Sequence, residues 1–222
     1  VTPTLFDEAD EVHISVTFTW DLPVAEYLYS QWKHVAPTNM GGVAIGMKGD
    51  EFTPGMYVKH GYTITSRGCN NKCWFCSVWR RDGTIRELVI KDGYNILDDN
   101  LLQCSDQHIN RVFEMLKRQN KKAEFTGGIE AKMITEKIAK KIYELKPKQL
   151  FCAYDTPDDL PSLINAGKIF KEVGFNGHVC RAYVLIGYKN DTFDKATKRM
   201  IETINAGFMP MAMLWRDGLG KY

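Results

Sequence analysis

The sequence predicts an α/β fold, a partial (β/α)6 TIM-like barrel preceded by a small strand–helix–strand extension. From about residue 60 onward, short β-forming runs alternate with longer segments of helical period, which is typical of repeated βα units on a parallel sheet. Six such units can be counted, fewer than the eight that close a full barrel. We therefore expect residues 1–60 to form the extension and residues 61–222 an open, curved barrel with its chemistry at the C-terminal ends of the strands.

Six β-forming runs define the predicted strands. They are Tyr62–Thr65, Tyr94–Leu97, Ala123–Thr126, Gln149–Tyr154, Val179–Ile186 and Met209–Leu214. Within the last run, Met209, Met211 and Met213 alternate, so we expect these methionines to face the core.

Helical period follows most of these strands. Apolar residues recur every three or four positions in His108–Gln119 and in Ile134–Leu145, and Asp158–Val173 fits the same pattern. For the last helix, Asp191 is the expected N-terminal cap, and Gly207 is expected just past the end.

The first 60 residues have a different character. A β-run at His13–Thr19, a helical segment at Val24–Trp32 and a second β-run at Val43–Met47 predict a strand–helix–strand fragment. The stretch Lys48–Gly61, which is punctuated by glycine and proline, follows it.

Composition narrows the function classes. The 222 residues are 44% hydrophobic, and 29 basic against 27 acidic residues give a net charge of +2. That balance lacks the basic excess typical of a nucleic-acid binder. No run approaches the roughly 20 apolar residues that cross a bilayer, and the acidic N-terminus does not resemble a signal peptide. We therefore expect a cytoplasmic protein without a membrane partner.

Three of the six cysteines are concentrated in one short segment. Cys69, Cys73 and Cys76 form a C-x-x-x-C-x-x-C pattern directly after a predicted strand. Gly68 and the pair Asn70-Asn71 favour a loop, which can wrap three thiolates around one soft-metal centre. The pattern therefore predicts a metal or cluster site.

Alternatives to an iron–sulfur cluster fit the pattern less well. A structural zinc site needs four ligands, so Cys104 or a histidine would have to complete it. A disulfide framework is uncommon in a reducing compartment. An electron-transfer cluster usually has four cysteine ligands, whereas three leave one iron open for chemistry. The isolated Cys104, Cys152 and Cys180 are expected to be small buried apolar residues.

The segment resembles the radical S-adenosylmethionine (SAM) signature C-x-x-x-C-x-Φ-C, with Phe75 in the aromatic position. The layout from Tyr62 to Trp215 is similar to the partial barrel of that superfamily. The preceding residues resemble a shortened form of the Rossmann-like domain of its cobalamin-type members. That part is too short to enclose a corrinoid and lacks a D-x-H-x-x-G motif, so cobalamin is not expected.

The resemblance implies an enzyme in which the three cysteines hold a [4Fe–4S] cluster. Such a cluster reductively cleaves SAM to methionine and a 5′-deoxyadenosyl radical, which abstracts hydrogen from a substrate. The partner would be a flavodoxin-like or ferredoxin-like electron donor. The substrate stays open between a small molecule, a nucleoside or nucleic acid, and a peptide, and no catalytic side chain is singled out. The alternative is a non-catalytic iron–sulfur carrier or sensor with Cys104 as fourth ligand, followed by a zinc-stabilised binding module.

The resemblance also indicates residues that would hold SAM. Asp98, Asp99 and Asn100 follow the second predicted strand, where the family binds the SAM amino group, although they equally suit a polar turn. Gly127 and Gly128 end the third strand and either let the ligand approach the backbone or form a tight turn.

Later strands supply further candidates. Arg181 interrupts an apolar strand, where a charge is costly unless it is paired, so we expect it to meet the SAM carboxylate or else Asp155 or Glu130. Tyr183 shares its face and is expected to border the same cavity. Asp155 is expected either to accept from the ribose hydroxyls or to cap a helix, and Glu130 is a weaker SAM candidate.

Overall fold

The computed structural model describes residues 1–47, 58–188 and 190–217 of the 222-residue chain. The chain divides into two compact units, Val1–Phe52 with Arg216–Tyr222 and Thr53–Trp215. Most of the predicted Lys48–Gly61 stretch, including residues 48–57, lies outside the described residues. We describe each unit by itself.

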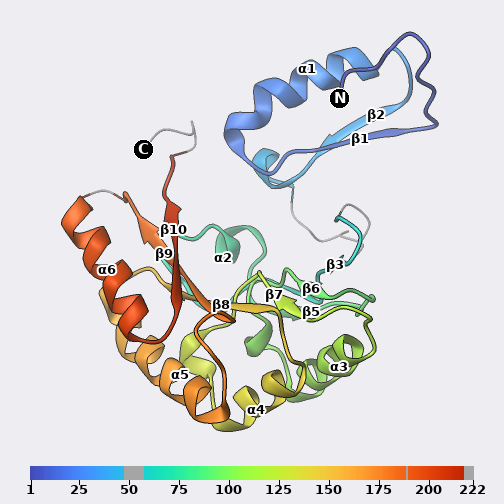
Figure 1. The fold of residues 1–222 in the computed structure, drawn as a ribbon. Helices are drawn as coiled ribbons and strands as arrows, with labels where there is room; N and C mark the ends of the chain where they lie inside the picture. The colour runs from blue at the N-terminus through green and yellow to red at the C-terminus, as the bar shows by residue number, and fades with distance from the viewer. Residues whose placement is uncertain (48–57, 189, 218–222) are drawn as a thin grey trace. The chain divides into compact units, whose positions relative to one another are not determined.

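The larger unit is built on a six-stranded parallel sheet (Figure 1). Its order is β10-β9-β8-β7-β6-β3, and each neighbouring pair is parallel. The strands are β3 (Tyr62–Thr63), β6 (Asn95–Ile96), β7 (Glu124–Phe125), β8 (Gln149–Tyr154), β9 (Cys180–Ile186) and β10 (Met209–Leu214). Every one falls within a predicted run, which confirms an α/β fold with a parallel sheet.

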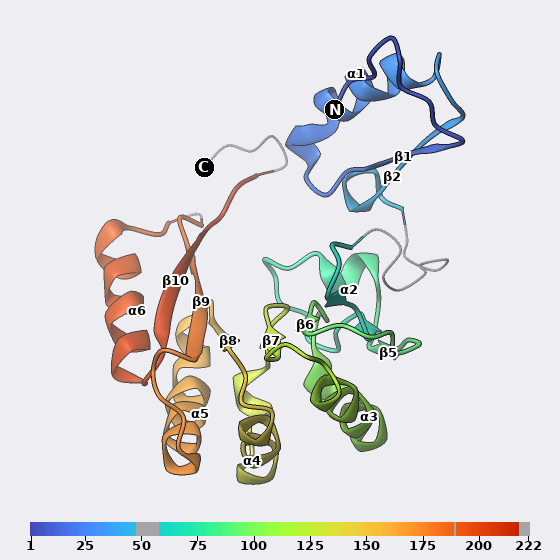
Figure 2. The ribbon, with the colours of Figure 1, turned by 45° about the vertical axis from the view of Figure 1, so that its right-hand side comes forward.

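Four helices cover one face of this sheet (Figures 1 and 2). They are α3 (Asp106–Lys117), α4 (Glu136–Glu144), α5 (Leu160–Val173) and α6 (Phe193–Asn205). Among the helices in the described ranges, none combines the length and the apolar composition that a membrane crossing needs.

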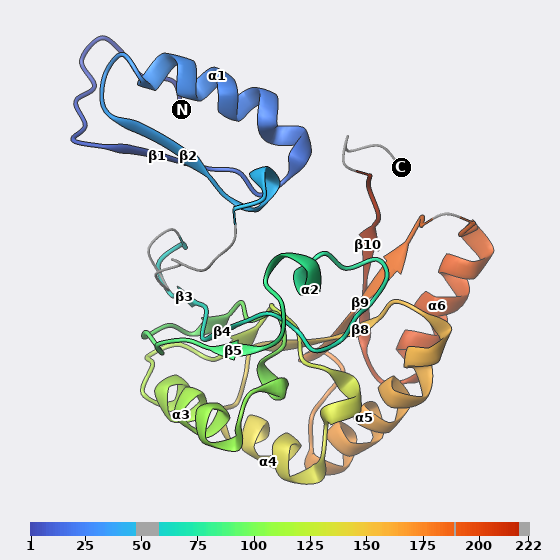
Figure 3. The same cartoon turned by 180° about the vertical axis from the view of Figure 1, so that it is seen from behind.

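A short segment with two small strands follows β3 in the chain (Figure 3). β4 (Ser66–Arg67) pairs antiparallel with β5 (Arg86–Glu87), and α2 (Val78–Arg81) lies between them in the chain. This pairing joins the two ends of the loop that contains Cys69, Cys73 and Cys76.

The start of α6 differs from the prediction. The Thr192 hydroxyl, not Asp191, accepts the capping hydrogen bond from the Lys195 N–H. The Asp191 carboxylate instead accepts from the Gly187 N–H at 2.8 Å and forms an ion pair with Arg199 at 2.6 Å. Arg199 lies on the second turn of α6, a partner that local sequence does not disclose. Gly207 has φ +91°, which confirms the predicted end of the helix.

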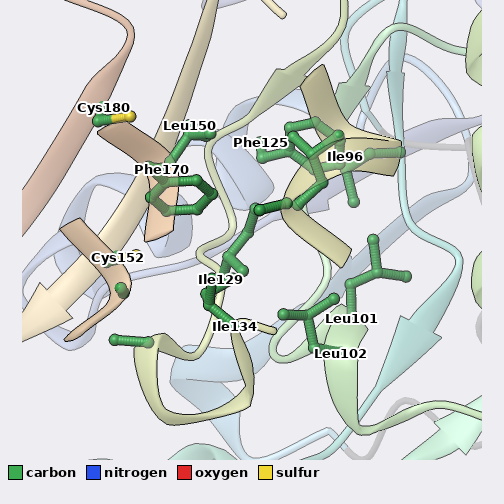
Figure 4. Close-up of a cluster of buried hydrophobic side chains, with 14 of the residues drawn as sticks. Ile96, Leu101, Leu102, Phe125, Ile129, Ile134, Leu150, Cys152, Phe170 and Cys180 are labelled. Carbon is green, nitrogen blue, oxygen red and sulfur yellow. The ribbon is translucent and has the colours of Figure 1, made fainter. Parts of the chain in front are cut away.

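The core lies between the sheet and its helices (Figure 4). On β8, Leu150, Cys152 and Tyr154 are buried in it on alternate positions. Cys104 and Cys180 are also buried, so all three isolated cysteines behave as predicted.

The predicted core role of the methionines on β10 is wrong. Met209, Met211 and Met213 are 39%, 36% and 48% exposed. Their register partners on β9 are Arg181, Tyr183 and Leu185, on the face of the sheet away from the core. Alternation alone predicts that the three share a face, but not which face the helices cover.

The smaller unit contains a parallel pair, β1 (Val12–Ser15) and β2 (Thr38–Gly41), with α1 (Leu22–Trp32) between them in the chain. The strand–helix–strand order is as predicted, but the second strand is not Val43–Met47. Residues Val43–Ile45 form a 3-10 turn that follows Gly42, whose φ is +118°. A β-carbon there would meet the Val16 carbonyl oxygen at 2.4 Å, so the close turn excludes other residues.

Gly167 provides a test of the packing between α5 and the residues after α6. Helix propensity alone favours alanine by about 1 kcal/mol. A β-carbon at Gly167 would lie 1.8 Å from the Ala206 carbonyl oxygen, so Gly167→Ala must push the two segments apart. We expect it to lower the free energy of unfolding by about 1–3 kcal/mol in urea titrations. Lys168→Ala, the adjacent exposed position, is the control and should change it by less than about 0.5 kcal/mol.

Candidate metal and cofactor site

A cavity of about 800 Å³ opens where strands β6 to β9 end. Its wall combines the cysteine loop, residues 69–76, with the segments that follow β6, β7 and β8 and with Tyr183 of β9. Its size falls in the range of small-molecule and cofactor sites.

Cys69, Cys73 and Cys76 all line this cavity, and each is partly exposed. Burial raises the pKa of the Cys73 thiol, and the charges of Cys76 and Cys69 raise it further. The pKa of Cys76 is raised by burial and also by Cys69, against a backbone hydrogen bond from Val78 that lowers it. The three sulfurs are therefore close enough to repel one another as thiolates, so a bound cation would favour their ionisation.

The cysteines do not form a ready site for one ion. In the described part of the chain, no group of three or more His, Cys, Asp or Glu side chains could hold a metal ion. An iron–sulfur cubane places its irons at separate corners, so its thiolates surround the cluster instead of converging on one point. Three cysteines on one cavity wall are compatible with that requirement.

Local geometry explains why the loop begins where it does. The Cys69 N–H donates to the Gly83 carbonyl at 3.1 Å, directly beyond the β4–β5 pair. Gly68 has φ +88°, and a β-carbon there would lie 2.2 Å from the Thr84 carbonyl oxygen. Glycine is therefore required immediately before the first cysteine.

The two carboxylates after β6 hold the segment before Cys69. Asp98 is fully buried and accepts from the Thr65 N–H and hydroxyl, both at 2.6 Å, and from the Ser66 hydroxyl at 2.7 Å. Asp99 lines the cavity, but its Oδ2 accepts from the Gly68 N–H at 2.9 Å. Burial raises the pKa of both carboxyls. Asp98 does not line the cavity, and its carboxylate binds the segment before Cys69 instead of a ligand.

Glu130 links the loop after β7 to the cysteine loop. Its carboxylate accepts from the side-chain amides of Asn71, Asn100 and Gln103 at 3.0, 2.7 and 2.8 Å. Lys132 forms an ion pair with it at 2.5 Å. Burial raises the pKa of Glu130, but these hydrogen bonds, that of Lys132 above all, lower it below its ordinary value overall. Glu130 was predicted only as a weaker candidate, and local sequence does not disclose its amide partners, which lie 27 to 59 positions away.

Asn100 brings an unpaired acceptor to the cavity wall. Its Nδ2 lies 3.7 Å from the Cys69 sulfur as well as 2.7 Å from Glu130. Its Oδ1 is buried without a hydrogen-bond partner among the described residues. A buried carbonyl oxygen left without a donor is costly, so this position suits a ligand N–H group such as an ammonium.

The two glycines after β7 are glycine for different structural reasons. A β-carbon at Gly127 would lie 2.3 Å from the Asp98 carbonyl oxygen, so strand packing requires this glycine. Gly128 has φ +107°, and a β-carbon there would meet nothing within 4 Å. Gly128 therefore leaves open space on a wall of the cavity.

The segment after β8 makes its part of the cavity wall acidic. Asp155, Thr156, Asp158 and Asp159 line the cavity, together with Ser162. Thr156 and Asp159 form a capping box, and Asp159 also accepts from the Asp155 N–H at 3.1 Å. Capping is thus not the role of the Asp155 side chain. Burial, and next the charge of Asp159, raise the pKa of Asp155 to about 6.

On β9, only one of the two predicted residues lines the cavity. Tyr183 lines it, stacks on Phe151 at 4.4 Å between ring centres and donates to the Thr126 carbonyl at 3.1 Å. Arg181 is not part of the lining, and its Nη1 contacts the Met211 sulfur at 3.8 Å. No ion pair joins Arg181 to another residue of the described ranges, so the expected pairing with Asp155 or Glu130 is not formed.

A series of aromatic contacts joins the cysteine loop to the segments that follow β9 and β10. Phe75 lines the cavity and packs edge-on against Trp74 at 4.9 Å. Trp74 contacts Tyr188 at 4.1 Å, and Tyr188 packs against Trp215 at 5.0 Å. Tyr188 and Trp215 follow β9 and β10, so the loop after β3 reaches the opposite edge of the sheet. Trp74 was not among the predicted site residues, although an aromatic residue between two cysteines of a loop was a usable signal.

Most predicted site residues share this one cavity. Its lining includes Cys69, Cys73, Cys76, Phe75, Asp99, Asn100, Gly127, Gly128, Asp155 and Tyr183, while Asp98 and Arg181 lie outside it.

The raised pKa of Asp155 predicts a pH-dependent effect of Asp155→Asn. Between about pH 4 and 6 the folded state holds a proton that the unfolded state has lost, so this group costs stability as pH rises and costs most above pH 6. The variant should gain roughly 1–3 kcal/mol over wild type at pH 7.5, and little at pH 4. Urea titrations at both values measure this. Asp158→Asn removes an exposed carboxylate from the same turn and is the control; an equal gain in both variants would contradict a special environment at Asp155.

Comparison with known proteins assigns no family to this site. No protein-family model and no curated protein matches the sequence. The case for a function therefore rests on the residues and geometry of the cavity.

Proposed function

We propose that this protein is a radical SAM enzyme in which Cys69, Cys73 and Cys76 bind a [4Fe–4S] cluster. The observation that carries the proposal is the presence of all three cysteines, at the family spacing, on one wall of an 800 Å³ cavity. When bound and reduced, the cluster supplies the electron that splits SAM into methionine and a 5′-deoxyadenosyl radical for hydrogen abstraction.

The other cysteines support an open iron site. Cys104 does not line the cavity, and burial raises the pKa of its thiol to about 11. Cys152 borders the cavity, but it is fully buried and belongs to the core beside Leu150 and Tyr154. Neither position favours a fourth thiolate, so the observations favour the enzyme over a four-cysteine electron carrier.

The cavity residues fit the chemical groups of SAM. The unpartnered Oδ1 of Asn100 suits the ammonium group, on the same wall as the cysteines. The open space at Gly128 suits close approach of a ligand to the backbone. Asp155, ionised above pH 6, suits acceptance of hydrogen bonds from ribose hydroxyls.

Aromatic side chains would protect such a site from water. Phe75 lies on the cavity wall between Cys73 and Cys76, and Trp74 holds the loop against Tyr188. Excluding water and oxidants is the main contribution that a protein makes around a reactive radical.

The proposal extends to the fold and to the partner. We take the curved parallel sheet with its helices as a partial (β/α)6 barrel, and the small βαβ unit as a Rossmann-like fragment. A flavodoxin-like or ferredoxin-like protein would supply the electron, in a cytoplasmic setting that keeps the cysteines reduced.

The first test is anaerobic reconstitution of the full chain with iron and sulfide, followed by dithionite and SAM. We expect 5′-deoxyadenosine and methionine to form in equal amounts, measured by chromatography. Cys73→Ala should lose the cluster absorbance and reduce cleavage to the background without protein. The matched control is Cys104→Ser, which should keep both the cluster and the cleavage.

Other outcomes would identify the alternatives. A cluster that is reducible but does not cleave SAM indicates an electron carrier or a sensor, especially if Cys104→Ser destroys that cluster. A stoichiometric zinc ion that iron and sulfide do not replace indicates a zinc-stabilised module. Either result contradicts the enzyme.

A further inference from the structure

The sheet presents an exposed face that the cysteine cavity does not account for. It lies on the side of the sheet away from the core, across three adjacent strands, β8, β9 and β10 (Figure 1). We call it the Arg181 face. Its members are Arg181, Tyr183, Met209, Met211 and Met213, together with Phe151, which is buried beneath Tyr183.

Arg181 is the unusual member of this face. Its guanidinium carries a positive charge that forms no ion pair within the described residues. Among the residues that the structure describes, Nη1 has the Met211 thioether, a weak acceptor, as its partner at 3.8 Å. Nε is buried without a partner, and the charge lies 5.8 Å from the centre of the Phe151 ring. A partly buried arginine without an oxygen acceptor is costly, unless an anion from outside pairs with it.

The surroundings of Arg181 are suited to an apolar body. Tyr183 stacks on the buried Phe151 with the rings nearly parallel, at 12°, so the partly exposed Tyr183 ring forms a flat aromatic surface on the same face as the cation. Met209, Met211 and Met213 are more than a third exposed. Methionine side chains adapt to varied apolar shapes, so they favour binding over a fixed packing role here.

The Arg181 face adjoins the cysteine cavity through one residue. Tyr183 belongs to both, and it lies two positions after Arg181 on the same strand, a rise of about 7 Å. A molecule whose anionic end meets Arg181 can therefore extend along the strand toward the cavity. The cavity lining does not include Arg181, which separates this anion position from the SAM position proposed above.

We propose that the Arg181 face binds the substrate of this enzyme, and that this substrate is a small molecule with a flat apolar body and a carboxylate. The planar guanidinium can form two parallel hydrogen bonds to a carboxylate, while Tyr183 and the methionines contact the apolar body. The assignment of the Arg181 face as a substrate site rests on the proposed radical SAM function, whereas its preference for a carboxylate ligand does not depend on that function.

Binding can be measured without SAM or turnover. The full chain is labelled with ¹³C at the methionine methyl groups, and the Met211 signal is assigned with Met211→Leu. The probe is 3-phenylpropionate, and its neutral control is 3-phenylpropionamide. We expect saturable shifts of the Met211 signal, with the carboxylate binding about tenfold tighter than the amide or better.

Variants identify the source of that preference. Arg181→Gln should bring the two probes to equal, weak affinity, and Arg181→Lys should keep part of the preference because it keeps the charge. Lys168→Gln, an exposed cation on α5, is the control and should behave like wild type. Equal binding of both probes to wild type, or a preference that survives Arg181→Gln, would overturn the proposal.

SAM is the competing occupant of Arg181. Equilibrium dialysis of SAM against the reconstituted protein should give the same affinity for wild type and Arg181→Gln. A tenfold loss in the variant would assign Arg181 to the SAM carboxylate and overturn the substrate role. If the carboxylate preference holds but no 5′-deoxyadenosine forms, the binding face stands and the radical SAM function fails, so the two failures are distinguishable.

Discussion

The buried carboxylate of Asp98 is the interaction on which the candidate site depends. It accepts three hydrogen bonds from Thr65 and Ser66, which places the chain after β3 against the end of β6. Burial alone raises the pKa of this carboxyl, so those donors are what make its position tolerable. The next residue, Asp99, holds the Gly68 N–H, and the first cysteine follows. The start of the cysteine loop is thus held in place by the Asp98 side chain, which does not line the cavity.

The charge balance of the cavity explains why it suits a cationic or metal-bearing occupant. Three thiols share one wall, and the charges of Cys76 and Cys69 add to the effect of burial in raising the pKa of Cys73. Asp155, Asp158 and Asp159 add carboxyl groups to the cavity lining, while Lys132 is already paired with Glu130. Without a bound cation the thiols of Cys73 and Cys76 therefore favour their protonated form. Binding of a cluster would release their protons, which makes assembly favourable at higher pH.

Strand positions, which depend on local sequence, were predictable, whereas side-chain exposure and contacts between residues far apart in the chain were not. The β8 and β10 runs were predicted to the residue, because long apolar runs in a parallel sheet leave little ambiguity. The exposure of Met211 was not, because alternation does not say which face the helices cover. Asp98 and Arg181 both looked like ligand contacts. Asp98 is instead bonded to residues 32 and 33 positions earlier, a relation that only the folded chain reveals.

Tyr183 lies where the two halves of the site meet. Its hydroxyl donates to the Thr126 carbonyl at the end of β7, next to the Gly127-Gly128 turn, while its ring stacks on Phe151. Both contacts fix the ring, since one holds its polar end and the other its face. A fixed aromatic ring between the cysteine cavity and Arg181 gives the two regions a shared and rigid boundary. A ligand that spans them would be positioned by side chains of the sheet, which hold a binding geometry more precisely than loops do.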